Sequence, residues 1–243
     1  MKGIIEMAES ATDWPAWLSA IGTLLVSVVA ILLALFKEKI TAIWKSPELV
    51  IELNPSPPDS HKTIMRASGQ AGFPPSEWPV FYWRMRILNK GKSGAENVEV
   101  IVASVEKKSG NTYKKVDAFP PENLVWSTYF EQGHQTAVFM PTLSPGTYKF
   151  CNLGYAFPPG KTQTVNPAVK PFLDAGKVIF QFQVKWQSNI GYWQLVPGVY
   201  RFVIWAAASN SDRVSKEFEI EVDGDWTDNE GTMLSQRVSI TEV

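Results

Sequence analysis

The sequence predicts a mainly β protein, in which an antiparallel β-sandwich is preceded by one N-terminal transmembrane α-helix. Two observations carry this prediction. Between Asp13 and Lys37 the chain runs for 23 residues without a charged side chain. From Glu48 onward, short segments of alternating apolar and polar residues are separated by turns rich in proline and glycine. The first pattern is typical of a helix that spans a bilayer, and the second of strands with one buried face.

The uncharged segment 14–36 is long enough to cross a membrane. As a helix it would cover ~35 Å, against ~30 Å for the hydrocarbon core of a bilayer. A secretory signal peptide would have a basic start and a small-residue cleavage site. Here residues 1–13 form a short acidic tail, and the apolar run ends in Leu35 and Phe36. A buried helix of a soluble protein would need neighbouring helices, and none is predicted downstream.

Charge on either side of the segment predicts its orientation. Lys37, Lys39 and Lys45 follow it, whereas the tail before it is acidic. Because positive charge is retained in the cytoplasm, we expect a single-pass protein of the cell inner membrane, with its N-terminus outside and its β-domain inside. Residues 37–47 continue the helical pattern as an interfacial linker, and Pro47 marks its end. Tryptophans at both ends fit the headgroup levels and are expected to contact membrane lipid: Trp14, Trp17 and Trp44.

One face of the predicted helix carries small and mildly polar residues. Small residues spaced about one turn apart let two helix backbones approach closely, and hydroxyls can bond across the contact. The alternative is that such residues are simply common in membrane helices. The stripe makes a homo-oligomer one of the expected assemblies, and its members are Ser19, Gly22, Thr23, Ser27, Ala30 and Ala34.

The β-domain is expected to cover residues 48–224, and residues 225–243 are expected to form an acidic loop and a C-terminal strand or tail. The segment 200–208 is apolar on both sides, as in a central strand. Eight or more short strands in roughly 175 residues indicate a sandwich. The predicted strands are 48–54, 81–87, 97–106, 136–140, 147–152, 180–187, 200–208, 217–222 and 236–242.

One turn motif occurs twice, as SPGTYKF (144–150) and VPGVYRF (196–202). Proline fixes φ at one turn position, and glycine takes the positive φ that follows. We interpret both copies as the same turn, which delivers the chain into a new strand.

A resemblance supports the sandwich. The string NKGKSGAENVEV (89–100) resembles the strand–loop–strand of immunoglobulin-like domains of the CARDB and related bacterial types, and the later Pro-Gly-x-Tyr turn fits them as well. The whole layout is similar to an uncharacterised family of bacterial single-pass membrane proteins, through the N-terminal helix, YWRMRILNKGKSGAENVEV (82–100), SPGTYKFCNLGY (144–155) and the closing DW…MLSQRVSI (225–240). The resemblance implies an immunoglobulin-like fold and membrane anchoring, and it implies no activity. CARDB-type domains are usually external adhesion or binding modules, which would require the opposite topology.

The residues available for catalysis are few. His61 and His134 both lie in segments that read as loops, and neither has a second ligand at zinc spacing. Cys151 lies in a predicted packed strand, where cysteine usually acts as a small apolar residue. No phosphate-binding loop or nucleophile elbow is present. We therefore expect no enzyme activity and no cofactor.

Two charged segments have opposite signs. The acidic stretch 223–231 could supply oxygen ligands for Ca²⁺, but its glycine and glutamate spacing does not fit an EF-hand, so a solvated loop is favoured. The predicted hairpin 106–115 would bring four lysines together, and these could contact anionic headgroups or simply be solvated. They are Lys107, Lys108, Lys114 and Lys115. With a net charge of −1 and no basic stripe, we expect no nucleic-acid partner.

Aromatic residues suggest where a protein partner would bind. Trp83, Trp186 and Trp205 fall in predicted strands and are expected to fill the core. Tyr192 and Trp193 follow a loop, where aromatic side chains either anchor a partner or pack beneath the loop. Trp78 and Trp226 are further candidates for partner binding.

The sequence therefore favours a membrane-anchored binding or scaffolding module. Its β-sandwich would hold a protein partner at the cytoplasmic membrane surface. Two alternatives stay open: a self-associating membrane effector that acts through its helix, and an external ligand-binding or adhesion module.

Overall fold

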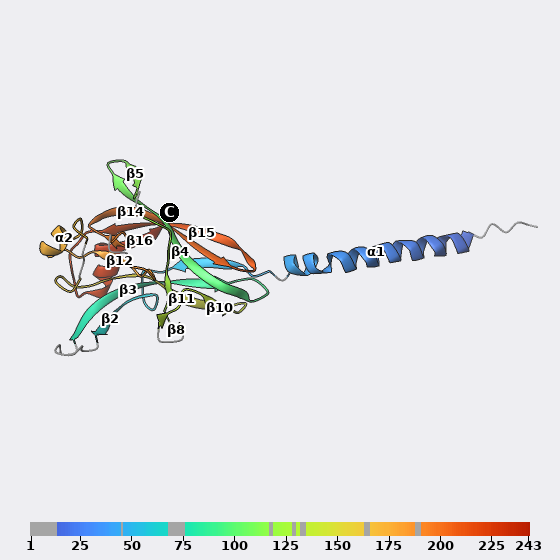
Figure 1. Ribbon diagram of the computed structural model, residues 1–243, viewed down its shortest axis with the longest axis horizontal. Helices are drawn as coiled ribbons and strands as arrows, with labels where there is room; N and C mark the ends of the chain where they lie inside the picture. The colour runs from blue at the N-terminus through green and yellow to red at the C-terminus, as the bar shows by residue number, and fades with distance from the viewer. Residues whose placement is uncertain are drawn as a thin grey trace, which may run out of the picture. The chain divides into compact units, whose positions relative to one another are not determined.

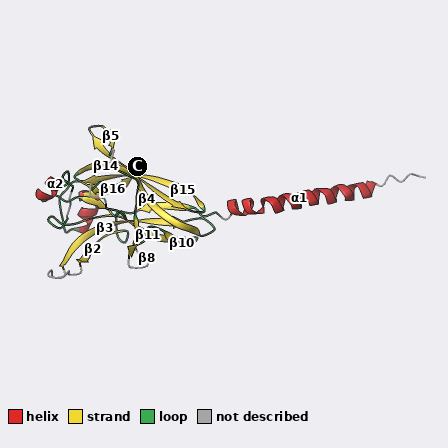
Figure 2. Ribbon diagram, viewed as in Figure 1, coloured by secondary structure: helices red, strands yellow, loops and turns green. Residues whose placement is uncertain are grey.

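The computed structural model describes residues 14–44, 46–67, 76–116, 119–127, 130–131, 135–162, 166–187 and 191–243. The chain forms two compact units, Met1–Lys45 and Ser46–Val243 (Figure 1). The first contains the long helix α1, and the second contains the strands (Figure 2).

Helix α1 runs from Trp14 to Trp44. Its segment Trp17–Lys37 has a mean hydropathy of 2.6 and no buried side chain, so it is long and apolar enough to span a membrane. The helix does not stop where the apolar run ends, because no glycine or proline follows before Pro47. The first part of the expected linker is therefore a continuation of α1.

The second unit is a sandwich of two antiparallel sheets. The first sheet has the order β1 (Leu49–Leu53), β3 (Ser76–Asn89), β11 (Tyr148–Ala156), β12 (Phe180–Phe182) and β13 (Gln194–Leu195). In addition, β2 (Ser60–Ala67) pairs with β3, and β7 (Val125–Trp126) pairs with β11.

The second sheet is built around three long strands, β4 (Ala95–Ser109), β14 (Gly198–Ala208) and β15 (Ser211–Val222). Its order is β10 (Met140–Leu143), β4, β14, β15 and β16 (Val238–Glu242). The short strands β5 (Thr112–Lys115) and β6 (Glu122–Asn123) pair with β4, and β8 (Phe130–Glu131) pairs with β9 (Gln135–Thr136) in a separate hairpin. The remaining elements are α2 (Lys170–Asp174), α3 (Glu230–Thr232) and the π-helix η1 (Met233–Arg237). Strand β14 lies between β4 and β15, which confirms the central strand predicted from its apolar faces.

A chain of aromatic rings crosses the core from one sheet to the other. Trp83 and Phe182 of the first sheet both contact Phe180, with ring centroids 5.5 and 5.3 Å from its ring. Phe182 then contacts Phe202 of the second sheet at 5.4 Å, and Phe202 stacks on Phe218 at 5.5 Å. All five side chains are buried, and burying one such side chain contributes ~1.5–3 kcal/mol.

The expectation that Trp186 fills the core is wrong. Strand β12 ends at Phe182, and Val184 makes only an isolated bridge to Leu124. The chain then bends away from the sheet, so the side chain of Trp186 is 75 % exposed. Trp205 is half-buried on the outer face of β14, where the guanidinium carbon of Arg213 lies 3.8 Å from its ring centroid.

The two Pro-Gly-x-Tyr copies also differ, so the interpretation of one turn used twice is wrong. Gly146 has φ +68°, as the turn requires, whereas Gly198 has φ +149° and already belongs to β14. The two tyrosines differ as well. Tyr200 is buried and its hydroxyl donates to Val196 O at 3.0 Å, whereas Tyr148 is 43 % exposed. The Tyr200 contact has the form of the tyrosine corner of immunoglobulin-like sandwiches.

Other strand boundaries needed correction. The predicted strand 136–140 is divided between the end of β9 and the start of β10. The predicted strand 236–242 begins only at Val238, because η1 precedes it. Strand β2 was not predicted, and it contains His61, which we had expected in a loop.

Candidate functional site

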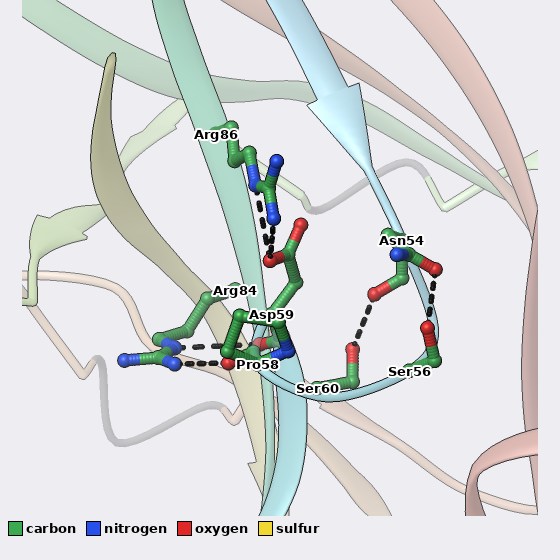
Figure 3. Close-up of polar contacts among 7 residues, drawn as sticks. All are labelled: Asn54, Ser56, Pro58, Asp59, Ser60, Arg84 and Arg86. Atoms are coloured by element: carbon green, nitrogen blue, oxygen red, sulfur yellow. Dashed lines mark hydrogen bonds and ion pairs between the residues drawn. The ribbon is translucent and has the colours of Figure 1, made fainter. Parts of the chain in front are cut away.

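The loop between β1 and β2 places a buried carboxylate beside the first sheet. Ser60 Oγ donates to Asn54 O at 3.0 Å, and Ser56 Oγ donates to Asn54 Oδ1 at 2.7 Å (Figure 3). These bonds tie the two ends of the loop together. Asp59 at its end is 1 % exposed. A buried carboxylate needs a charged or hydrogen-bonding partner, and β3 supplies it.

Two arginines of β3 converge on this loop. Arg86 donates from Nε and Nη2 to Asp59 Oδ1, at 3.0 and 2.7 Å (Figure 3). Arg84 donates from Nε to Asp59 O at 3.3 Å and from Nη2 to Pro58 O. The hydrogen bonds that Arg86 donates to Asp59 raise the pKa of Arg86, whereas burial lowers the pKa of Arg84. Both guanidinium groups remain charged, since arginine is not deprotonated in proteins.

Each arginine lies over an aromatic ring of the neighbouring strand β11. The guanidinium carbon of Arg84 is 4.3 Å from the ring centroid of Phe150, and that of Arg86 is 4.9 Å from the ring of Tyr148. The two rings contact each other edge to face at 5.4 Å. Alternation along β3 points Trp83 and Met85 into the core and therefore directs the arginines outward. We call this set, Arg84, Arg86, Tyr148 and Phe150, the arginine face.

The arginine face carries excess positive charge. Asp59 neutralises Arg86 directly, whereas Arg84 bonds only to two backbone carbonyls among the residues that the structure describes. The guanidinium groups are held in place by stacking and hydrogen bonds before any partner arrives. A preorganised arginine between aromatic rings loses little conformational entropy on binding an anion.

An aromatic run continues from the arginine face along the outer side of the first sheet. Its members are His61, Tyr82, Tyr155, Phe157 and Trp78, with successive ring centroids 6.5, 5.7, 5.0 and 6.2 Å apart. Lys161 Nζ lies 5.8 Å from the ring of Trp78. Trp78 Nε1 and His61 Nδ1 are buried and have no hydrogen-bond partner within the described part of the chain. Burial lowers the pKa of His61.

The other predicted anchors of a partner lie elsewhere. Tyr192, Trp193 and Trp226 are half-buried and pack against the core. Trp226 contacts Phe81 edge to face at 5.2 Å. Of the four candidates, the structure brings only Trp78 to the aromatic run. The fully buried Asn89 and the arginine pair were not singled out from the sequence, although alternation already placed Arg84 and Arg86 on the polar side of their strand.

Asn89 forms hydrogen bonds that fix the segment by which the chain enters the sandwich. Its Oδ1 accepts from Glu48 N and Gly91 N at 3.1 and 3.0 Å, and its Nδ2 donates to Ser93 O and Leu143 O at 2.7 and 2.9 Å. Lys90 N and Lys92 N donate to Glu48 O and Ser46 O. A Cβ on Gly91 would lie 2.4 Å from Ser46 O, so only glycine fits there. The residues just after α1 are thus fixed to the end of β3 and to the loop that leads from β3 to β4.

The acidic loop, residues 223–231, exposes carboxylates to solvent, with the side chains of Asp225 and Asp228 54 % and 70 % exposed, and these carboxylates also have cationic partners. Asp223 contacts Arg237 at 2.5 Å, Asp225 contacts Lys177 at 2.8 Å, and Asp228 contacts Lys62 at 2.8 Å. Glu230 Oε1 accepts the backbone N–H of Lys62 at 2.6 Å. Within the described ranges, no three His, Cys, Asp or Glu side chains are placed to hold a metal ion.

Cys151 lies in the core on β11 and is fully buried. Burial raises the pKa of its thiol, so the thiolate needed of a nucleophile is disfavoured. His134, the other histidine considered from the sequence, lies outside the described residues.

On helix α1, the hydroxyls of the small-residue stripe bond within their own helix. Thr23 Oγ1 donates to Ser19 O at 2.9 Å, and Ser27 Oγ donates to Thr23 O at 2.8 Å. Gly22, Ala30 and Ala34 are exposed on α1. Trp17 is exposed, and the side chains of Trp14 and Trp44 lie outside the described part.

The predicted lysine hairpin is present. Strands β4 and β5 pair with Lys107 opposite Lys114, and Lys108 and Lys115 lie beside them, all four side chains exposed.

Comparison with models of known protein families gives no match, and comparison with curated proteins gives none either.

Proposed function

We propose that this chain is a membrane-anchored binding module whose arginine face holds a protein partner at the membrane surface. The observation that carries the proposal is the alternation of Tyr148, Arg86, Phe150 and Arg84 on the outer face of a rigid sheet. Arginine and aromatic side chains are the residues most enriched at the energetic centres of protein interfaces. A partner segment that carries a carboxylate would match the uncompensated charge of Arg84.

We further propose that the sandwich is of the CARDB-related immunoglobulin-like type and that the chain belongs with bacterial single-pass membrane proteins. The tyrosine corner at Tyr200 and the Asn-x-Gly loop at Asn89 support this relation. The positive residues after the apolar helix support an inner-membrane location, with the N-terminus outside and the sandwich in the cytoplasm. An external binding module remains the alternative if the orientation is reversed.

We propose that the protein has no catalytic role. The burial of the Cys151 thiol supports this, because a nucleophilic cysteine needs access and a lowered pKa. Self-association through α1 is a weaker alternative than partner binding. The hydroxyl hydrogens of Thr23 and Ser27 are donated within the helix, which leaves only their oxygen lone pairs for a bond to a second helix.

Site-specific photo-crosslinking tests the arginine face. A photoreactive amino acid at Tyr148 in the full chain, in native membranes, should give a discrete protein adduct, and Arg84→Gln should abolish it. Arg213→Gln is the matched control, because Arg213 also stacks on an aromatic residue, Trp205, but on the opposite sheet. Adducts that persist in Arg84→Gln, or that are lost equally in Arg213→Gln, would contradict the proposal.

A further inference from the structure

The lysine hairpin, Lys107, Lys108, Lys114 and Lys115 on β4 and β5, concentrates unpaired positive charge. No ion pair joins any of these four lysines to a carboxylate of the described residues. Five lysines elsewhere in the sandwich do have such partners, whereas Lys92, Lys149 and Lys161 have none among the described residues but do not lie together in one hairpin. The five are Lys62, Lys90, Lys170, Lys177 and Lys216. The hairpin is therefore a local excess of charge in a chain whose net charge is −1.

One cross-strand pair of the hairpin brings like charges together. Lys107 lies directly opposite Lys114, and like charges in that position destabilise a strand pair, whereas Lys115 lies opposite Glu106. Nearby rings compensate in part, since Lys107 Nζ lies 5.4 Å from the ring centroid of Tyr200 and Lys108 Nζ lies 5.8 Å from that of Tyr113. A charge cluster that opposes strand pairing points to a binding role.

The chemistry of the hairpin fits a diffuse anionic surface better than a protein pocket. All four cations are lysine, which acts as a hydrated point charge, and none is arginine, which makes bidentate contacts. The tip, residues 109–112, is polar and exposed and offers no apolar anchor. Protein interfaces are depleted in lysine, whereas lysine clusters next to membrane anchors are typical of binding to anionic headgroups.

We propose that the lysine hairpin binds anionic phospholipid headgroups of the membrane in which α1 is anchored. This inference rests on the membrane anchoring proposed above. The hairpin is at one end of β4, and Ala95 at the other end follows the loop that fixes Ser46 and Glu48. The contact with lipid is therefore separate from the point at which the chain enters the sandwich. Tethering to the same bilayer raises the effective lipid concentration that the lysines meet.

Energy transfer in nanodiscs tests the proposal on the full chain. A donor dye is attached at Asn111→Cys, on the hairpin tip, because the buried Cys151 does not compete for the label. The acceptor dye is on lipid headgroups, and discs of phosphatidylcholine alone are compared with discs that also contain phosphatidylglycerol. We expect higher transfer in the anionic discs, and we expect high salt to remove the difference, because salt screens exposed charges.

Two variants with the same change in net charge decide the result. Replacing Lys107, Lys108, Lys114 and Lys115 by glutamine should abolish the dependence on phosphatidylglycerol. Replacing the exposed Lys90, Lys92, Lys149 and Lys170 by glutamine should leave it unchanged. Equal transfer in both kinds of disc, or equal loss in both variants, would overturn the proposal. Recovery of the chain with the discs measures anchoring by α1 separately. A failure of membrane anchoring can therefore be distinguished from a failure of the hairpin to bind anionic lipid.

Discussion

At the scale of single residues, the role of a side chain depends more on its surroundings in the fold than on the sequence motif that contains it. Tyr148 and Tyr200 occupy the same place in two copies of one sequence pattern. Tyr200 closes a buried corner, where burial raises its pKa to about 12 and keeps its hydroxyl a donor to Val196 O. Tyr148 is half exposed and carries Arg86 over its ring. The first tyrosine stabilises the sandwich, and we assign the second to binding.

This difference gives a paired prediction. Tyr200→Phe should lower the free energy of unfolding by about 1 kcal/mol, because Val196 O loses its donor in a partly buried place. Tyr148→Phe should leave it unchanged, since no hydrogen bond of its hydroxyl is seen among the described residues. Thermal unfolding of the purified chain followed by circular dichroism measures both. Equal melting temperatures for Tyr200→Phe and the parent would contradict the assignment of a stabilising corner.

At the scale of elements, the acidic loop protects an exposed edge of the first sheet. Among the strands that the structure describes, β2 pairs only with β3, so alternate N–H groups point away from the sheet. Glu230 accepts one of them, from Lys62, and Asp228 binds the side chain of the same residue. A free edge is a template for unwanted pairing with other chains. The loop is therefore a structural cover, and the charged pattern that suggested calcium has this explanation instead.

Hydrogen exchange tests the cover. Glu230→Ala should speed exchange of the Lys62 amide several-fold, because its acceptor is removed while the ladder between β2 and β3 remains. Glu221→Ala, an exposed carboxylate on β15, is the control and should have no effect on that amide. Unchanged protection of Lys62 in Glu230→Ala would show that the edge is shielded by another group.

At the scale of the whole molecule, the chain joins a long apolar helix to a sandwich with very little sequence between them. Helix α1 ends at Trp44, and Ser46 is already bound by the loop that Asn89 organises. The orientation that we propose depends on the three lysines beside the helix, because positive charge near a membrane span is retained in the cytoplasm.

A reporter fused after the exposed Val243 measures this orientation. It should report the cytoplasmic side in the parent chain. Replacing Lys37, Lys39 and Lys45 by glutamate should produce a mixed or inverted topology. Replacing the four hairpin lysines should not, because they are too far from the span in sequence to direct insertion. An external reporter in the parent chain would favour the adhesion alternative over the cytoplasmic module.

Local patterns in the sequence were sufficient for the apolar helix, for most long strands and for the outward direction of Arg84 and Arg86. These features depend on a residue's own chemistry and on the repeat of two or 3.6 residues, both of which are visible in a short window. The central place of β14 followed from its two apolar faces.

Only the tertiary structure decided which distant residues meet. Asp59 reaches Arg86 across 27 positions, and Glu230 reaches Lys62 across 168. Strand pairing likewise ends β12 at Phe182 and leaves Trp186 in solvent. The apolar–polar alternation of the sequence continues to Trp186 and did not reveal this end. The physical reason is that strand partners and loop contacts are chosen by packing of the whole sandwich, which local periodicity does not encode.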